Sequence, residues 1–329
     1  MKLGLVIGSF SPLHNGSLTL CKVANAVSEK IIIVVINSSS DQIPIKLRIH
    51  WLKQENPHAI VKQLEKNTPL SFEDQLIKML KSSLNYLGSN ELQLFSSDPS
   101  LANLAKRIKI KCTILDPERL GQNIKSADII ADPYMRWFDM PLSVRLSLIR
   151  RIVLIGPESV GKSTLAKQLR SSSVKQPFLP EYGRPYETFR KRGPYEDYEF
   201  EDIVKIHAAH RKALLPFSGP IFIEDTDELA TAVWVEMLMS KRLINIEKQI
   251  KLPFLYLLMD PSVPFISETI RYFDNEKRLE FFNKIKDKLE YYKASYTIIK
   301  GDWATREVES QKIIKRLLAE KINWSKIIH

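Results

Sequence analysis

The chain of 329 residues contains little cysteine and no long apolar run. Its two cysteines, Cys21 and Cys112, lack the number and spacing of a disulfide framework or of a metal site. A membrane-spanning helix would need a run of about 18 apolar residues, which the sequence does not contain. The N-terminal stretch MKLGLVIGSF has no small-residue cleavage site and is typical of a first strand rather than a signal peptide. We therefore expect a protein of the reducing cytoplasm without a membrane span.

A concentrated positive patch is also missing. The net charge is +11, but residues 1–150 carry 19 basic and 13 acidic side chains, and residues 151–329 carry 30 and 25. Nucleic-acid-binding proteins usually gather their basic residues on one face or arm, whereas an even excess suits small anionic ligands. We expect nucleosides and nucleotides as partners rather than nucleic acid, and the sequence leaves homo-oligomerisation open.

Apolar, strand-like runs alternate with amphipathic, helical stretches along the whole chain. In the first half the expected strands cover residues 3–8, 30–37, 59–64, 92–97 and 111–116. A connector at 132–150, with two prolines and three arginines, ends in a helix. In the second half the expected strands cover residues 151–156, 177–184, 220–227, 253–260 and 295–302. This alternation predicts the α/β class, with two doubly wound parallel-sheet domains at residues 1–149 and 150–329.

The most specific motif is GPESVGKST, which fits G-x-x-x-x-G-K-[ST] and lies between an apolar strand and a helix. In such a loop, backbone N–H groups and the helix N-terminus bind phosphate oxygens, and the glycines allow their close approach. Lys162 reaches the β- and γ-phosphates, and the Ser163 hydroxyl ligates Mg²⁺. The motif predicts ATP and Mg²⁺ as ligands, held by Gly156, Pro157, Glu158, Ser159, Val160, Gly161, Lys162, Ser163 and Thr164.

Charged side chains near other expected strands supply further candidates. The strand PIFIEDTD contains Asp225 and Asp227, and a carboxylate there can position Mg²⁺; Asp225 is the preferred ligand. Glu181 in LPEYGR can take a proton from an acceptor hydroxyl or bind it. In ETIRYFDNEKR, Arg271 or else Arg278 can stabilise charge on the transferring phosphoryl group. The structural alternatives are acids that begin a helix and a solvated basic helix face.

Together these stretches resemble the bifunctional NadR family, which joins a nicotinamide-mononucleotide adenylyltransferase domain to a P-loop ribosylnicotinamide kinase domain. The resemblance spans nearly the whole chain. Its matching stretches in the second half are GPESVGKST, EYGR, DTD at 225–227, VPFISETIR and GDWATRE. It implies a Rossmann-like nucleotidyltransferase followed by a P-loop kinase. It also implies nucleoside or metal binding at Glu181, Tyr182, Arg184, Asp225 and Asp227.

Two departures from the family pattern concern the second half and the start of the chain. The family usually has Asp-Gly before the arginine of the fourth stretch, where this chain has Glu268 and Thr269. Some members carry an N-terminal helix-turn-helix, whereas this sequence starts directly at its first strand. The expectation is therefore an enzyme rather than a repressor.

The stretch GSFSPLHNGS, after the first strand, looks like the phosphate-binding turn of adenylyltransferases with one letter altered. Such turns end in His-x-Gly-His. Here His14 is retained and Ser17 stands for the second histidine, and a serine is shorter and uncharged. The nucleotide site expected in this half comprises Gly8, Phe10, His14, Gly16 and Ser17.

The family's second signature, Ser-x-Thr-x-Ile-Arg-x-x-Pro, is matched by SADIIADP at 126–133. Asp128 stands for its threonine and Ala131 for its arginine, so a phosphate-binding cation is lost and an anion is gained. Losing one preorganised donor costs about 2.7–4 kcal/mol of transition-state stabilisation. We therefore expect a degenerate adenylyltransferase domain whose fold is intact, since none of these changes touches the apolar pattern.

Several functions fit these residues. The favoured one is ATP- and Mg²⁺-dependent phosphorylation of nicotinamide riboside to nicotinamide mononucleotide in NAD biosynthesis, with catalytic residues Lys162, Glu181, Asp225, Asp227 and Arg271. The alternatives are a nucleotide-sensing module without efficient turnover and a bifunctional enzyme that also makes NAD. A P-loop kinase with another nucleoside substrate fits as well, because base selectivity rests on pocket shape.

Overall fold

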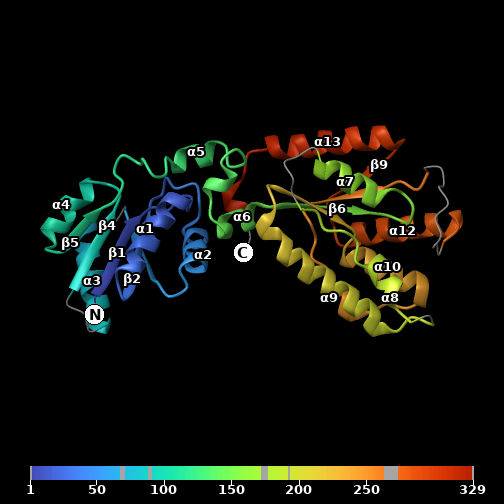
Figure 1. The fold of residues 1–329 in the computed structure, drawn as a ribbon, viewed down its shortest axis with the longest axis horizontal. Coiled ribbons are helices and arrows are strands. Elements are labelled where there is room, and N and C mark those ends of the chain that lie inside the picture. Colours follow the sequence, from blue (N-terminus) through green and yellow to red (C-terminus); the bar gives the residue numbers. More distant parts are fainter. Residues whose placement is uncertain are drawn as a thin grey trace. The chain divides into compact units, whose positions relative to one another are not determined.

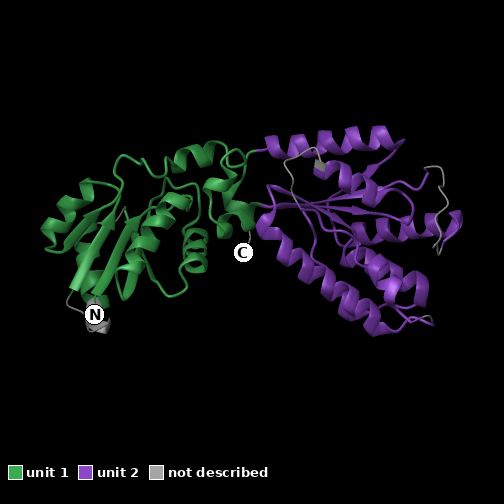
Figure 2. Ribbon diagram, in the orientation of Figure 1, with its two compact units in different colours: residues 1–148, 321–329 green, residues 149–320 purple. Residues whose placement is uncertain are grey.

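The computed structural model describes residues 2–66, 71–87, 91–171, 177–191, 193–262 and 273–327. The chain forms two compact units (Figures 1 and 2). Unit 1 consists of Met1–Leu148 and Lys321–His329, and unit 2 consists of Ile149–Glu320. The last residues, which the sequence pattern placed in the second domain, therefore group with the first unit.

Unit 1 contains a parallel sheet of five strands in the order β3-β2-β1-β4-β5 (Figure 1). The strands are β1 (Lys2–Gly8), β2 (Lys30–Asn37), β3 (Ile60–Glu65), β4 (Glu91–Ser96) and β5 (Lys111–Ile114). The central strands are almost entirely buried and rich in isoleucine and valine, as in sheets covered on both faces. The strand order reverses between β1 and β4, where ligands of such sheets bind at the carboxyl ends.

Helices cover both faces of the sheet in unit 1. On one face Leu76 and Leu104 pack against the apolar side chains of β1, β2 and β4. On the other face the backbone at Gly4 is closely packed, because a Cβ atom there would lie 2.8 Å from the hydroxyl oxygen of Ser28 and 3.1 Å from Cγ2 of Ile31. The helices are α1 (Asn15–Ala26), α2 (Ile45–Glu55), α3 (Phe72–Leu87), α4 (Ser100–Arg107), α5 (Ser126–Ala131), η1 (Trp137–Asp139) and α6 (Leu142–Leu148).

Unit 2 contains a parallel sheet of four strands in the order β7-β6-β8-β9. The strands are β6 (Arg150–Ile155), β7 (Ile221–Asp225), β8 (Leu255–Met259) and β9 (Tyr296–Ile299). The expected strand at 177–184 is absent among the described residues of that segment, where Leu179 forms a single bridge with Glu224. Pro177 and Pro180 explain the difference, since proline has no N–H to donate to a ladder.

Two layers of helices enclose the sheet of unit 2. On one face Leu165 of α7 and Ile314 of α13 pack against the strands, and on the other Val233 of α10 and Phe281 of α12 do so. The helices are α7 (Lys162–Ser171), α8 (Gly183–Phe189), α9 (Asp197–Leu214), η2 (Leu215–Phe217), α10 (Glu228–Met239), α11 (Ile244–Glu247), α12 (Asn275–Tyr291) and α13 (Trp303–Ala319). The predicted α/β class with two parallel sheets is confirmed.

The C-terminal segment contributes to the core of unit 1. Trp324, in the short helix η3 (Trp324–Lys326), is 4% exposed and meets the ring of Trp51 edge-on at 6.2 Å between centroids. Trp51 is fully buried, and its indole N–H donates to the Ser147 hydroxyl at 3.0 Å. Among the described residues, no helix has both the length and the apolar character needed to cross a bilayer.

Candidate active site

The loop between β6 and α7 has the conformation that its glycines permit. Gly156 and Gly161 adopt positive φ angles of 147° and 81°, which glycine adopts without steric cost. A Cβ atom at Gly156 would lie 3.0 Å from the carbonyl oxygen of Met259, so the loop also needs glycine for close packing. Val160 anchors the loop in the core with no exposed surface. The path of the loop into α7 therefore depends on both glycines, and a glycine-containing loop before a helix is typical of anion-binding sites.

Lys162 is the first residue of α7 and is only 5% exposed. Its ammonium donates to the carbonyl oxygens of Gly156 and Pro157 at 3.0 and 2.8 Å. The charge is therefore held against the loop, within reach of phosphate groups bound there. Thr164 is exposed on α7, and Glu158 accepts a hydrogen bond from the backbone N–H of Phe273 at 2.8 Å.

Arg306 secures the phosphate loop from α13 and was not singled out by the sequence reasoning. It is 1% exposed and donates to the carbonyl oxygens of Val160 and Asp260 at 3.0 and 2.8 Å. Trp303, on the same helix, lies directly over Gly161, where a Cβ atom would come within 1.8 Å of its ring. Two residues of the stretch GDWATRE therefore pack against the phosphate loop and hold it in place.

Asp225 and Ser163, the two residues expected to bind the metal, are in contact with each other. The Ser163 hydroxyl donates to Oδ2 of Asp225 at 2.5 Å, while Oδ1 of Asp225 is buried without a hydrogen-bond partner among the described residues. Burial and the negative charge of Glu181 raise the pKa of Asp225, although Lys162 and Ser163 act in the opposite direction. A hydroxyl and a carboxylate with a spare oxygen suit Mg²⁺, which completes its shell with water and phosphate oxygens. The residues present therefore fit this ion.

Asp227 has a different environment from the one the sequence reasoning assigned to it. Its Oδ1 atom accepts from the backbone N–H groups of Leu229 and Ala230, and its Oδ2 atom accepts from the Tyr256 hydroxyl at 2.6 Å. Both oxygens are thus engaged in capping α10 and in a buried contact with β8. This geometry gives Asp227 a structural role and speaks against the expected contact with metal or substrate.

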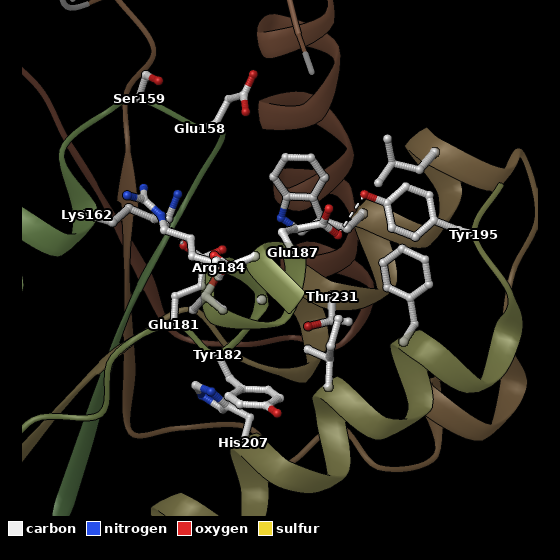
Figure 3. A pocket seen from close by; sticks show the side chains of 17 residues that line it. Glu158, Ser159, Lys162, Glu181, Tyr182, Arg184, Glu187, Tyr195, His207 and Thr231 are labelled. Carbon is white, nitrogen blue, oxygen red and sulfur yellow. Dashed lines mark hydrogen bonds and ion pairs between the residues drawn. The ribbon is translucent and has the colours of Figure 1, made fainter. Parts of the chain in front are cut away.

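A cavity of about 470 Å³ adjoins the phosphate loop (Figure 3). Lys162, Glu181 and Arg184 gather on one side of it, and Tyr195 lies on the other (Figure 3). The described residues that line it also include Glu158, Ser159, Tyr182, Gly183, Glu187, Thr188, Phe200, Ile203, His207, Thr226, Thr231, Trp234 and Leu238. One end is charged and the other aromatic, as a ligand with phosphate and ring groups requires.

Glu181, the residue expected to act as base for the acceptor hydroxyl, lies in the wall of this cavity. Its carboxylate lines the cavity and is close enough to Asp225 to raise the pKa of that residue. Arg184, one turn along α8, donates to Oε2 of Glu181 at 3.1 Å. The predicted residues Lys162, Glu181, Arg184 and Tyr182 are therefore brought to one cavity.

The aromatic end of the cavity is held by an ion pair that the sequence reasoning did not identify. Arg190 donates to both carboxylate oxygens of Glu199 at 3.1 and 3.2 Å and lies over the ring of Tyr195 at 4.0 Å. The Tyr195 hydroxyl donates to Glu187 at 2.8 Å. On α10, Trp234 stacks on Phe273 with ring centroids 5.0 Å apart. These contacts fix the orientation of two rings that face the cavity.

The arginines expected over the transferring phosphoryl group have different outcomes. Arg271, with the stretch VPFISETIR at 263–271 that contains Glu268 and Thr269, lies outside the described residues. Arg278 is 2% exposed and donates to Asn275 and to the carbonyl oxygen of Pro261. Arg278 therefore anchors the start of α12, and its expected contact with the phosphoryl group stays a prediction.

Unit 1 has its own cavity of about 1340 Å³ at the reversal between β1 and β4. The five predicted residues Gly8, Phe10, His14, Gly16 and Ser17 all line it. Arg119 lines it too, a cation that the sequence reasoning did not single out. Of the segment 126–133, Ser126 lines the cavity, whereas Asp128 forms an exposed ion pair with Arg136 at 3.7 Å. Asp128 therefore repels phosphate groups in the cavity less strongly than the sequence indicated, because Arg136 offsets its charge.

His14 and Ser17 form a reciprocal cap at the start of α1. The backbone N–H of Ser17 donates to Nδ1 of His14 at 3.3 Å, and the Ser17 hydroxyl donates to the carbonyl oxygen of His14 at 2.9 Å. Burial, and then the positive charge of Arg119, lower the pKa of His14 to about 4. His14 is therefore neutral near pH 7, and the Ser17 hydroxyl donates to the helix cap rather than into the cavity.

Comparison with known proteins gives matches over the second unit and over the whole chain. A sequence family described as an AAA domain matches residues 151–306. The trifunctional NAD biosynthesis/regulator proteins NadR of Salmonella typhimurium and Escherichia coli are 22% and 23% identical to this chain, and both alignments cover 97% of it and 84% of the relative. Crystal structures of NadR protein in complex with NR, and with NAD and AMP-PNP, superpose with TM-scores of 0.72 and 0.71 at 19% identity. Both cover 98% of this chain and 97% of the other, so the fold is that of these structures.

Proposed function

We propose that this chain, a homologue of the NadR proteins over 97% of its length, phosphorylates nicotinamide riboside with ATP to give nicotinamide mononucleotide. The observation that carries the proposal is the single cavity in unit 2 that joins the phosphate loop, the Glu181 carboxylate and an aromatic end. The names of the relatives support a place in NAD biosynthesis, and the ligands of the two NadR structures support a site for a nicotinamide nucleoside and an ATP analogue.

The chemistry follows from the positions of the side chains. The Glu181 carboxylate accepts the proton of the substrate's 5′-hydroxyl as its oxygen bonds to the γ-phosphorus. The bond from that phosphorus to the bridging oxygen of ADP breaks at the same time. Lys162, which is buried against the loop, stabilises the negative charge that the phosphate groups carry. Ser163 and Asp225 would hold Mg²⁺, which when bound neutralises phosphate charge.

The aromatic end of the cavity supports a flat, uncharged or cationic ring as the base. Tyr182, Tyr195, Phe200 and Trp234 line this part of the wall. Trp234 and Tyr195 are both held by further contacts, so their faces are preorganised. The pyridinium ring of nicotinamide riboside carries a positive charge, and such a charge is attracted to aromatic faces.

In unit 1 we propose a nucleotide site with little or no adenylyltransferase activity. The proposal is supported by the neutral state of His14 and by the use of the Ser17 hydroxyl within the cap of α1. One N–H of a neutral imidazole and the charges of Arg119 and Lys66, which both line the cavity, remain for binding an anion. Binding without efficient adenylyl transfer is the expected result.

The test is a kinase assay of the purified protein against a panel of nucleosides, with each product identified by mass. The proposal requires that nicotinamide riboside be phosphorylated with the highest kcat/KM of the panel. A higher kcat/KM for another nucleoside would identify that nucleoside as the substrate and would still support a kinase activity. Slow ATP hydrolysis that no nucleoside stimulates would favour a nucleotide-sensing module instead.

A further inference from the structure

Two polar atoms in the cavity of unit 2 have no role in the mechanism above. Oγ1 of Thr226 and Nε2 of His207 are buried, and neither has a hydrogen-bond partner among the described residues. The two residues are 7% and 4% exposed, and both line the cavity. Buried polar atoms in native proteins are nearly always hydrogen-bonded, so two such atoms at one ligand cavity indicate partners on the ligand.

Thr226 is held in a backbone conformation that its side chain does not favour. Its φ angle is +71°, which is unusual and strained for a β-branched residue. Its backbone N–H donates to the carbonyl oxygen of Leu154 at 3.0 Å, which fixes the turn beside β6. The turn places Asp225 against Ser163 on one side and puts Thr226 in the wall of the cavity, with its hydroxyl buried.

His207 reaches the same place from α9. It lies on the buried face of that helix, one turn from Ile203 and one turn from Arg211. Burial lowers the pKa of His207, Arg211 lowers it further, and Glu224, Glu228 and a hydrogen bond to the backbone of Thr226 oppose this. Since Nε2 has no partner, the bond to Thr226 is made by Nδ1. In the neutral ring Nε2 is then a buried acceptor without a partner among the described residues, on a residue that lines the cavity.

We propose that Thr226 and His207 bind the vicinal hydroxyls of the substrate's ribose and make the site selective for ribonucleosides. Their position supports the sugar rather than the base, because Thr226 directly follows Asp225, which bonds to the phosphate loop. In a nucleoside the ribose lies between the phosphorylated oxygen and the ring. A vicinal diol offers two O–H donors and two acceptors, which suit one imidazole acceptor and one hydroxyl. This inference rests on the proposed nucleoside kinase activity.

The experiment compares nicotinamide riboside with its 2′-deoxy and 3′-deoxy analogues in the full-length protein. The unmodified protein should prefer the riboside by at least about tenfold in kcat/KM. His207→Asn keeps a group near Nδ1 but removes Nε2, and Thr226→Val removes the hydroxyl at constant shape. Each should reduce the preference by roughly 3- to 10-fold, through a lower kcat/KM for the riboside alone.

Two matched variants separate recognition from packing. His207→Gln places an amide near the position of Nε2, and Thr226→Ser retains the hydroxyl, so both should keep most of the preference. A purely structural role would lower kcat/KM for riboside and deoxy analogues equally in His207→Asn and Thr226→Val. An unchanged ratio in those two variants, or no preference in the unmodified protein, would overturn the inference.

Calorimetric titration with the same three compounds distinguishes this inference from the proposed function. Tighter binding of the riboside without phosphorylation would refute the proposed kinase activity and support the proposed contacts with the ribose. Phosphorylation of riboside and deoxy analogues at equal rates would support the kinase activity and refute the ribose contacts. If no ribonucleoside tested is bound or phosphorylated, both proposals are refuted.

Discussion

The hydroxyl of Ser163 lies 2.5 Å from Oδ2 of Asp225. The two residues are brought together because β6 and β7 are parallel neighbours, with Leu154 in register with Asp225. The last residue of β7 and the loop after β6 therefore lie at the same edge of the sheet. This contact links the phosphate-loop motif to the acids of DTD.

The charge of Lys162 is the first target for mutation. Lys162→Ala should lower kcat/KM for nicotinamide riboside by about 10²- to 10³-fold, the size found when one preorganised charge-stabilising donor is removed. Lys167 is an exposed lysine on the same helix, and Lys167→Ala should leave the rate unchanged. Circular dichroism checks that both variants fold. Comparable rates for Lys162→Ala and the unmodified protein would exclude a phosphate-binding role for this lysine.

Much of this arrangement could be predicted from local sequence. Buried parallel strands such as KIIIVVIN read as continuous apolar runs, and the spacing of Gly156, Gly161 and Lys162 is dictated by phosphate geometry. Asp225 and Asp227 could not be ranked with certainty in this way, because both lie at the same strand end. Only the packing of Tyr256 of β8 against Asp227 shows which carboxylate is engaged inside the protein.

Other parts of the site depend on contacts between distant segments and leave no local pattern. His207 faces Thr226 only because α9 packs beside the end of β7, and HAAH reads equally well as a solvated helix. The tail after Glu320 has no motif that pairs it with Trp51. The alternation of strands and helices predicts the two sheets, whereas these contacts arise from tertiary packing.

A buried charge network under the site should control the stability of unit 2. Arg211 donates to both oxygens of Glu224 at 3.0 and 2.8 Å and to Glu228 at 2.7 Å. The two acids are 0% and 2% exposed, so Arg211→Met would leave their charges undercompensated. We expect a loss of about 3–5 kcal/mol in the free energy of unfolding, measured by urea denaturation.

The control for Arg211 is an ion pair with similar geometry at the surface. Arg242 donates to both oxygens of Glu247 at 2.9 and 2.7 Å, but its side chain is 59% exposed. Arg242→Met should leave the free energy of unfolding nearly unchanged, because solvent screens an exposed ion pair. Equal costs for the two substitutions would show that burial does not set the value of the network.

The protonation of His14 gives unit 1 a pH dependence with a definite sign. The folded protein lowers the pKa of His14 from 6.5 to about 4, so the unfolded chain takes up a proton first as the pH falls. Stability of unit 1 should therefore decrease from pH 6.5 towards pH 4. An NMR titration should find the His14 ring neutral at pH 6 in the folded protein and largely protonated at pH 5 in urea.

His14→Gln removes the titrating group and supplies the control. The decrease in stability of unit 1 between pH 7 and pH 5 should be smaller in this variant than in the unmodified protein. An identical decrease in both proteins would mean that other groups carry the pH dependence.

The tail residue Trp324 should stabilise unit 1 and leave unit 2 unaffected. Trp324 is 4% exposed against Trp51, and replacing a buried tryptophan by alanine typically costs about 3–5 kcal/mol. Trp324→Ala should destabilise unit 1 by that order, while Lys326→Ala, at an exposed position, should not.

A fragment of residues 149–320 should keep the kinase activity. A soluble but inactive fragment would mean that residues outside unit 2 complete the kinase site.

The last prediction concerns the chemistry of unit 1. The unmodified protein should convert nicotinamide mononucleotide and ATP to NAD at a negligible rate, although nucleotides can still bind in the cavity at β1 and β4. The reason is charge, because the leaving pyrophosphate develops negative charge and few cations face it. His14 is neutral and the Ser17 hydroxyl donates to the helix cap. Losing two preorganised donors at about 2.7–4 kcal/mol each would slow the reaction by several orders of magnitude.

Restoring the missing groups tests the same idea in the other direction. Ser17→His with Ala131→Arg and Asp128→Thr would return two donors, at a cost of about 1 kcal/mol for the lost cap of α1. The triple variant should form NAD faster than the unmodified protein, provided that the residue at 131, which is exposed on α5, can reach the cavity. The decisive measurement is NAD formation by the unmodified protein at saturating substrates. Turnover in the common enzyme range of about 1–10³ per second would show that Arg119 and the backbone of α1 replace the missing histidine and arginine, and that this site is a variant rather than a degenerate one.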